Sequence, residues 1–320
     1  MPSRISMASG MRARIPAKVD ANSLGKLIKS GGYETFYGGK VHLSPKLMPL
    51  KAGFDEYCKD QRDQLPAACI EFRDQPFFAV ASFINPHDIC FASNARQPDR
   101  RGKPLVDALY AGPGVAGGST AAIPSQQRHS RAGTGRHQSH HEGQRRHSCQ
   151  TDSQGFQLPR LAQRPMDLLP LTERVDAQIG RLLDALKSNG LEKNTLVVFT
   201  SDHGDMDGSH RLASKNVFYE NSAGVPFIMR YKGVIPAGVV DDKHLISNGL
   251  DVLPKLCDYA GVPIPEYLLG RTIRPLAEGG IDNARRPYIV AENTTGRMLR
   301  SDRYKYCVYV SAPSANPSSI

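Results

Sequence analysis

The strongest structural signal in the chain is LVVFTSDHGDMDGSHRLASKNVFYENSAGVPFIMRY, residues 196–231. An apolar run of β-favouring residues, 195–200, opens this region, and a second run, 225–231, closes it. A polar segment that begins with Asp202-His203-Gly204 follows the first run directly. Ligands gather outside the carboxyl ends of the strands in parallel α/β sheets. The order therefore predicts a site at the end of a buried strand.

The segments before this stretch alternate between helical and strand patterns. Val175, Ile179, Leu182 and Leu186 are spaced four, three and four residues apart, which predicts one face of an amphipathic helix. Residues 76–84 are nearly all apolar, as expected of a strand buried on both faces. Helix–strand alternation of this kind predicts an α/β fold with a mainly parallel central sheet sandwiched by helices.

The C-terminal part predicts a smaller unit. Residues 250–260 have a helical pattern, in which Pro254 is tolerable because it falls near the first turn. Residues 288–292 and 297–310 read as antiparallel strands with a turn at Ser301-Asp302. We therefore expect a small antiparallel subdomain at the C-terminus.

Charge and apolar periodicity divide the chain further. The chain has 320 residues and a net charge of +10, and residues 94–165 hold 11 Lys/Arg against 4 Asp/Glu. This segment is rich in His, Gln, Ser and Gly, and it lacks apolar periodicity. We expect a first part of the main domain at 1–101, a low-order basic segment at 102–170, the rest of the domain at 171–280, and the antiparallel subdomain at 281–320. No apolar run reaches the ~18 residues of a membrane-spanning helix.

Three polar clusters follow predicted strands. They are Lys40 with His42, His87, and Asp202 with His203. Each cluster alone fits a loop or a turn, and Asp202 fits a capping residue. Three clusters at equivalent positions of three strands predict one convergent site. Two groups carry no function in this interpretation: Asp205, Asp207 and His210 as solvated loop residues, and Tyr37, Tyr219 and Tyr309 as packing residues.

Four segments together resemble the type I sulfatase family of the alkaline phosphatase-like superfamily. Residues 196–231 resemble its second metal motif with the following lysine, and SLGKLIKSGGYETFYGGKVHL, 23–43, resembles its helix–strand–GKxH signature. SFINPHDI, 82–89, resembles the PH motif, and RMLRSDRYKYCVY, 297–309, resembles the C-terminal hairpin. The resemblance implies sulfuric ester hydrolysis, with a sulfated small molecule or carbohydrate as the substrate and without nucleic acid or membrane as a partner.

The resemblance also implies roles for single residues. Asp202 and His203 match the ligands of a divalent cation, usually calcium in the family. Lys40 and Lys215 match the lysines that contact sulfate oxygens. A hard cation and two ammonium groups suit the charge that develops on oxygen when a sulfate ester is attacked.

Further matches surround the nucleophile of the family. His87 matches the histidine that contacts the sulfate or the leaving oxygen, and His42 matches the histidine beside the nucleophile. Arg4, in Pro2-Ser3-Arg4, matches the arginine that supports the nucleophile. The nucleophile itself, a formylglycine made from Cys or Ser, would fall one residue before Met1. We therefore expect negligible aryl sulfate hydrolysis by this chain alone, and a periplasmic or secreted protein if the rest of the family's N-terminus exists.

Two segments depart from the family pattern, and three alternative functions stay open. Residues 105–169 and the tail 310–320 read like shifted reading frames of a truncated gene model or a decaying gene. One alternative is a phosphodiesterase or phosphonate monoester hydrolase of the same superfamily. Another is a catalytically dead fragment, either non-functional or a binder of sulfated glycans. The third is a nucleic-acid binder that uses the basic, His-rich segment.

Overall fold

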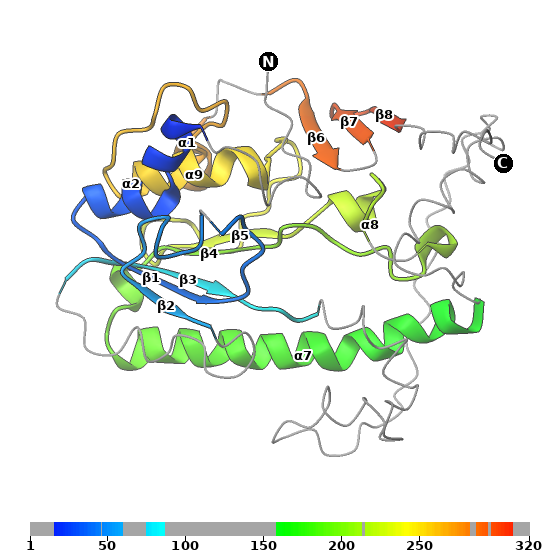
Figure 1. The fold of residues 1–320 in the computed structure, drawn as a ribbon, viewed down its shortest axis with the longest axis horizontal. Helices are drawn as coiled ribbons and strands as arrows, with labels where there is room; N and C mark the ends of the chain where they lie inside the picture. The colour runs from blue at the N-terminus through cyan, green and yellow to red at the C-terminus, as the bar shows by residue number, and fades with distance from the viewer. Residues whose placement is uncertain are drawn as a thin grey trace, which may run out of the picture.

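The computed structural model of the protein describes residues 16–45, 47–59, 75–86, 158–212, 215–281, 286–293 and 296–309. Figure 1 shows strands between a layer that contains α2 and α9 and the long helix α7 on the other side. The predictions for Arg4, His87, residues 102–157 and residues 310–320 lie outside these ranges.

A parallel sheet forms the N-terminal part of the fold. Its strands are β1 (Glu34–Gly39), β2 (Glu56–Cys58) and β3 (Phe77–Ser82), in the order β2-β1-β3. Both neighbours of β1 run parallel to it, and the register sets Gly39 opposite Ser82. The sheet confirms the predicted α/β class.

The strand at 76–84 is less buried than its composition predicts. Every residue of β3 is partly exposed, whereas β1 contains four buried residues. The order of the described sheet explains the difference, because β3 pairs with β1 on one side only. The all-apolar composition of this strand therefore does not mean that it lies between two neighbours in the described sheet.

Helices cover the two sides of the strands. α1 (Ala17–Ala21), α2 (Leu24–Ser30) and α9 (Asn248–Tyr259) lie on one side, and α7 (Leu158–Ser188) lies on the other (Figure 1). α10 (Arg274–Ala277) packs against α9, and η1 (Glu192–Asn194) follows α7. Within the described ranges, no helix is both long and apolar enough to cross a membrane.

α7 corrects one sequence prediction. The helix begins at Leu158, although we expected low order up to residue 170. That expectation rested on the basic, His-rich composition and on the loss of apolar periodicity. The apolar stripe, however, continues from Val175 back through Leu171 and Leu168, which contact each other. Helical spacing of the apolar residues therefore begins earlier in the chain than the overall composition suggested.

The strands around the polar segment form a separate pair in the described residues. β4 (Val197–Thr200) and β5 (Phe227–Arg230) are antiparallel, with Thr200 opposite Phe227. Between them lie η2 (Ser209–Arg211) and α8 (Glu220–Ala223). The chain leaves β4, makes an excursion of some 26 residues and returns beside it. We call residues 201–226 the site loop.

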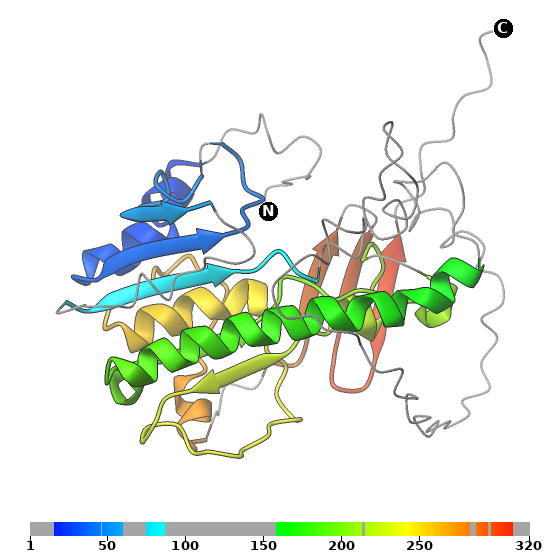
Figure 2. The same cartoon turned by 90° about the horizontal axis from the view of Figure 1, so that it is seen from below.

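The C-terminal subdomain has three antiparallel strands, as the predicted strand at 288–292 and the region 297–310 with its turn at Ser301-Asp302 imply. β6 (Ile289–Asn293), β7 (Gly296–Arg300) and β8 (Lys305–Tyr309) form an antiparallel meander, which Figure 2 shows side by side. The predicted turn is present, because Ser301 N donates to the carbonyl oxygen of Tyr304 at 2.8 Å. Met298 is buried, whereas Tyr306 on the neighbouring strand is exposed.

The proline in α9 also differs from its prediction. α9 begins at Asn248, so Pro254 is the seventh residue of the helix rather than part of its first turn. Proline cannot donate to the carbonyl oxygen of Leu250, and the helix continues nevertheless. Its buried side, which includes Cys257, contributes to the core beside Ile28 of α2.

Candidate active site

The end of β1 places Lys40 beside β3. Gly39 has a φ of +104°, and a Cβ atom there would lie 2.0 Å from the carbonyl oxygen of Ser82. Only glycine fits this approach. The next amide, Lys40 N, donates to the same oxygen at 2.7 Å. The GGK sequence therefore fixes where the Lys40 side chain leaves the sheet.

The end of β4 places Asp202 and His203 in contact with Lys215. Nζ of Lys215 lies 2.5 Å from Nε2 of His203, and Oδ2 of Asp202 lies 3.4 Å from the same nitrogen. Nδ1 of His203 lies 2.8 Å from the carbonyl oxygen of Gly204. A carbonyl oxygen only accepts and an ammonium group only donates, so Nδ1 carries the proton and Nε2 accepts. The imidazole is neutral in this arrangement.

The electrostatics favour this neutral form of His203. Burial lowers the pKa of the imidazole most strongly, and the ammonium groups of Lys215 and Lys40 lower it further. The hydrogen bond to Gly204 and the carboxylate of Asp202 act in the opposite direction. A neutral imidazole offers a lone pair, which is the form that binds a metal ion.

The site loop is closed on itself close to His203. Gly204 N donates to the carbonyl oxygen of Ser222 at 2.8 Å, and a Cβ atom on Gly204 would lie 2.0 Å from the carbonyl oxygen of Asn221. Ser222 Oγ donates to the carbonyl oxygen of Lys215 at 2.6 Å. Both ends of the loop and Lys215 are therefore tied together by short main-chain contacts.

The middle of the loop is packed and strained. Met206, Leu212 and Val217 form a buried cluster. Asp207 and His210 have positive φ angles of 44° and 55°, a conformation that costs energy for residues other than glycine. A loop that keeps such angles is held in one shape by its surroundings.

Two expectations about loop residues need correction. Asp205 and Asp207 are half-buried rather than solvated, and Oδ1 of Asp205 accepts the amide of Asp207 at 2.8 Å. His210 is exposed, as expected, but its ring stacks on Tyr219 with centroids 4.2 Å apart. Their polarity suggested solvation, whereas the sharp turn of the loop buries part of both aspartates and gives the Asp205 carboxylate a main-chain hydrogen bond.

Tyr37 lies near the site, although the sequence predicted only a packing role for it. Its hydroxyl donates to the carbonyl oxygen of Lys40 at 2.9 Å. Burial raises the pKa of Tyr37 most strongly, and the carboxylate of Asp202 adds to the increase. Tyr37 thus links the segment of Lys40 to the neighbourhood of Asp202. The packing role that we expected is present as well, because its ring lies edge-on to Phe54.

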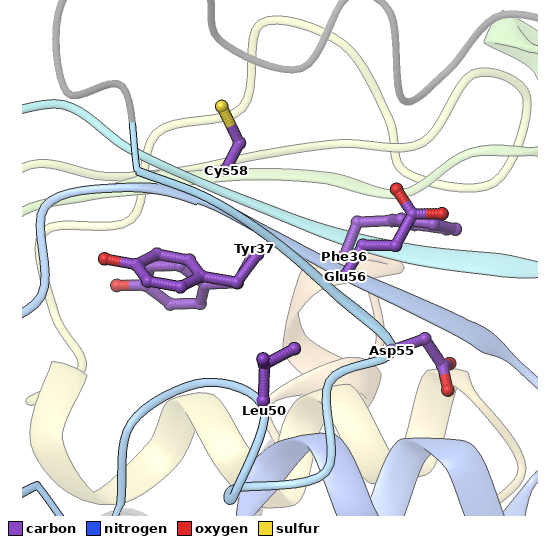
Figure 3. Close-up of a pocket in the computed structure, with 7 residues that line it drawn as sticks. Phe36, Tyr37, Leu50, Asp55, Glu56 and Cys58 are labelled. Atoms are coloured by element: carbon purple, nitrogen blue, oxygen red, sulfur yellow. The ribbon is translucent and has the colours of Figure 1, made fainter.

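Tyr37 also forms part of the lining of a hollow of about 380 Å³. Its lining residues are Phe36, Tyr37, Leu50, Asp55, Glu56, Tyr57 and Cys58. Figure 3 shows Leu50 pointing toward Tyr37, whereas Cys58 points away on the opposite side of its strand. The charged residues of the lining are the carboxylates Asp55 and Glu56. Like charges repel, so this lining does not suit a sulfate group.

Of the sequence-predicted site residues, the structure brings Asp202, His203 and Lys215 into contact around the His203 ring, and the ammonium group of Lys40 is near enough to lower the pKa of His203. His42 is described and exposed, two residues beyond Lys40. Arg4 and His87 lie outside the described residues. The four central residues combine one carboxylate, one neutral imidazole and two ammonium groups.

The donor set fits part of a site for a hard cation. The described residues contain no group of three His, Cys, Asp or Glu side chains that could hold a metal, and Asp202 and His203 are the two side chains here that could contribute ligands. The Asp202 side chain is 75% exposed, which leaves its oxygens accessible. Asn85, just after β3, is 8% exposed, and its Oδ1 has no hydrogen-bond partner in the structure. Carboxylate and amide oxygens are the ligands that calcium prefers.

Together, the fold and these residues define an α/β protein with a site suited to a divalent cation and a tetrahedral oxyanion. The family model for Sulfatase matches residues 1–262. The chain belongs to the sulfatase family, a family of sulfuric ester hydrolases, and the resemblance seen in its motifs is confirmed.

The chain is similar to several named sulfatases. It is 29% identical to the Delta 4,5-hexuronate-2-O-sulfatase of Bacteroides thetaiotaomicron, over 97% of this chain and 70% of that protein. Human arylsulfatase K is 34% identical over 154 residues, which are 44% of this chain and 28% of that protein. The chain thus spans well under two thirds of arylsulfatase K.

Solved structures agree with this assignment. A 2-O GAG sulfatase matches with a TM-score of 0.66 and 25% identity, over 93% of this chain and 66% of that chain. The phosphonate monoester hydrolase of Silicibacter pomeroyi matches with a TM-score of 0.56 and 18% identity, over 97% of this chain and 78% of that chain. The second likeness shows a shared fold.

Proposed function

We propose that this protein binds the sulfate group of a sulfated carbohydrate at Lys40, Asp202, His203 and Lys215, and that its activity is hydrolysis of the sulfate ester. The observation that carries the proposal is the 2.5 Å contact between Lys215 and a neutral His203, with Asp202 beside them. Nε2 of His203 has a single lone pair, so a bound cation would take it and the Lys215 ammonium group would contact a sulfate oxygen beside that cation.

Each central residue has a distinct task in the proposal. Asp202 and His203 contribute two ligands to a divalent cation. We infer that this cation is calcium, because the carboxylate of Asp202 is the more exposed of the two donors and calcium prefers oxygen ligands. When bound, such a cation supplies positive charge next to a sulfate oxygen. Lys40 and Lys215 place two ammonium groups on the same sulfate. Charge that grows on oxygen in the transition state is stabilised by groups already in place.

Three further residues complete the proposal. His87 lies in the PH motif after β3 and would contact the sulfate or protonate the leaving oxygen. His42 follows Lys40 and would act beside the nucleophile, and Arg4 would support that nucleophile. In the family the nucleophile is a formylglycine. The expectation of negligible turnover by this chain stays a prediction.

A binding experiment tests the site without relying on turnover. We expect inorganic sulfate, titrated calorimetrically in calcium chloride, to bind the purified protein, and calcium removal to weaken the binding. Lys215→Ala should weaken it at least about tenfold, because a charge-assisted contact contributes about 1.5–3 kcal/mol. Lys193→Ala is the matched control, since Lys193 is an exposed lysine in η1. Equal effects of the two substitutions would contradict the proposed site.

The substrate class is tested by comparing esters. The proposal rests on the chain's similarity to a hexuronate-2-O-sulfatase, and a 2-O-sulfated unsaturated uronide is therefore the first compound to try. We expect competition with inorganic sulfate by this sugar and by nitrophenyl sulfate, and weaker competition by a phenyl phosphonate ester. Preference for the phosphonate would favour the alternative within the superfamily. Turnover of nitrophenyl sulfate that Lys215→Ala abolishes would overturn the expectation of inactivity and support the site.

A further inference from the structure

The C-terminal sheet contacts the site loop at one residue, Phe218. Phe218 N donates to the hydroxyl oxygen of Tyr309 at 3.2 Å, and Nζ of Lys305 donates to the carbonyl oxygen of Phe218 at 2.8 Å. Both main-chain groups of Phe218 thus bond to side chains of β8. Figure 1 shows α8, which begins two residues later, close to β7 and β8.

These two bonds satisfy groups that secondary structure leaves open. Phe218 belongs to no helix or strand, and it is 4% exposed. A buried amide or carbonyl group without a partner costs about as much as a lost hydrogen bond. Side chains of β8 therefore supply the hydrogen bonds that a neighbouring strand would otherwise make with Phe218. They fix the position of the main chain at this residue.

Three other contacts strengthen the junction. The rings of Phe218 and Tyr309 pack with centroids 5.7 Å apart. Nζ of Lys305 also lies 2.5 Å from Oε1 of Glu220, and Arg300 bonds to the same carboxylate. Burial raises the pKa of Tyr309, which keeps its hydroxyl protonated over a wide pH range.

The junction lies three residues from Lys215. Val217, the residue before Phe218, is in the buried cluster with Met206. Ser222 Oγ holds the carbonyl oxygen of Lys215 at 2.6 Å. With Phe218 fixed on one side and Ser222 bonded across, little freedom is left for the backbone of Lys215. A displacement of Phe218 would move the backbone of Lys215 and, with it, the Lys215 ammonium group relative to His203.

We propose that Tyr309 and Lys305 are positioning residues that fix the backbone of Lys215, and with it the place of the Lys215 ammonium group in the site, through the main chain of Phe218. This inference rests on the proposed function, because it assigns the C-terminal sheet a part in sulfate binding at that same site. Neither residue needs to touch the substrate.

Tyr309→Phe tests the inference with a minimal change. It removes the hydroxyl that accepts the Phe218 amide and keeps the ring. Tyr306→Phe is the matched control, because Tyr306 lies on the same strand and is 69% exposed. We expect Tyr309→Phe to weaken the binding of inorganic sulfate, measured in calcium chloride, about three- to tenfold. Tyr306→Phe should leave the dissociation constant unchanged.

A double-mutant cycle separates positioning from general loosening of the fold. In the Lys215→Ala background, Tyr309→Phe should cause no further loss of sulfate affinity, because it acts through Lys215. Lys305→Met is a second route, since it removes the bond to the carbonyl oxygen of Phe218, and it should give the same non-additive loss. A general loosening would instead weaken the residual binding of the Lys215→Ala variant as well.

The outcomes distinguish the two proposals. If Lys215→Ala weakens sulfate binding and Tyr309→Phe does not, the positioning role is wrong and the proposed function stands. Additive losses in the cycle would overturn the positioning role too. If the wild-type protein binds no sulfate, or Lys215→Ala has no effect, the proposed function fails first.

Discussion

Asp202 and Lys215 in the site loop, and Asp251 and Lys255 in α9, are the same residue types in opposite environments. The Asp202 side chain is 75% exposed, whereas that of Asp251 is 2% exposed. Lys215 is half-buried and contacts His203, whereas Lys255 is fully buried with Nζ 4.0 Å above the ring centre of Phe227. Phe227 pairs with Thr200 of β4, so the two environments are neighbours.

The partners of the two aspartates explain their different roles. Asp251 accepts two hydrogen bonds from Arg286, both at 2.8 Å, and one each from the amides of Ser247 and Arg271. These four bonds use the acceptor capacity of its two oxygens. Asp202 accepts its own neighbour's amide, His203 N, at 3.1 Å, and keeps accessible oxygen. Asp251 is buried and fully hydrogen-bonded, so its role is structural. Asp202 keeps accessible lone pairs, so it is the candidate metal ligand.

The largest expected effect is a loss of stability when Asp251, the structural aspartate, is replaced. Asp251→Asn leaves Arg286 as a buried charge without its carboxylate, and breaking a buried ion pair costs about 3–5 kcal/mol. We expect a corresponding drop in the free energy of unfolding, measured by urea denaturation. Asp202→Asn is the matched control, and we expect it to stay within about 0.5 kcal/mol. Similar losses for both variants would remove the distinction.

The next largest effect is the contribution of Lys255 to the free energy of unfolding, which depends on pH. Burial lowers the pKa of this lysine from 10.5 to about 7, although Asp251 opposes the shift. Between these two values the unfolded chain binds the proton and the folded protein does not, so the free energy of unfolding rises with pH. Below about 7 both states are protonated and the cost of burying the charge is complete.

Lys255→Met should therefore stabilise the protein most at low pH. Replacing a buried charge by an apolar side chain of similar size can stabilise by about 1–4 kcal/mol. We expect such a gain at pH 6 and a much smaller one at pH 10, from urea denaturation at both values. A gain that is equal at both pH values would mean that the charge of Lys255 is not the cause.

The functional aspartate should respond in ligand binding rather than in stability. Asp202→Asn removes the negative oxygen ligand, and we expect calcium affinity to fall about 10- to 100-fold in a calorimetric titration. Asp242→Asn is the matched control, because Asp242 is an exposed carboxylate outside the site. Unchanged calcium affinity in Asp202→Asn would exclude Asp202 as a ligand.

Local pattern was enough to predict the fold class and the strand-end residues Lys40, Asp202 and His203 of the candidate site, and the family resemblance added Lys215. The apolar runs near 77–82, 197–200 and 227–230 are strands, and Asp202, His203, Lys40 and Lys215 come together. Each of these predictions depends on residues close in sequence. The pattern failed where a polar composition hides a short apolar stripe, as at the start of α7, and where burial depends on sheet order, as in β3.

The structural network could not be predicted from the sequence, because its partners are far apart along the chain. Arg286 is 35 residues from Asp251, and Phe218 is 91 residues from Tyr309. Nothing in the local pattern separates Asp251 from an exposed helical aspartate, or Tyr309 from a packing tyrosine. The three-dimensional structure distinguishes these residues, because it shows which side-chain oxygens are hydrogen-bonded and which are accessible.

The smallest expected effect concerns Tyr37, which supports the Lys40 side of the site as β8 supports the Lys215 side. Tyr37→Phe removes one buried hydrogen bond to the carbonyl oxygen of Lys40, worth about 0.5–1.5 kcal/mol. Lys40 N stays bonded to Ser82, so the end of β1 keeps its place and only part of that energy should reach the site. We expect sulfate affinity to fall about two- to fivefold, with Tyr33→Phe, just before β1, as the unaffected control. A loss as large as that of Lys215→Ala would show instead that Tyr37 contacts the sulfate itself.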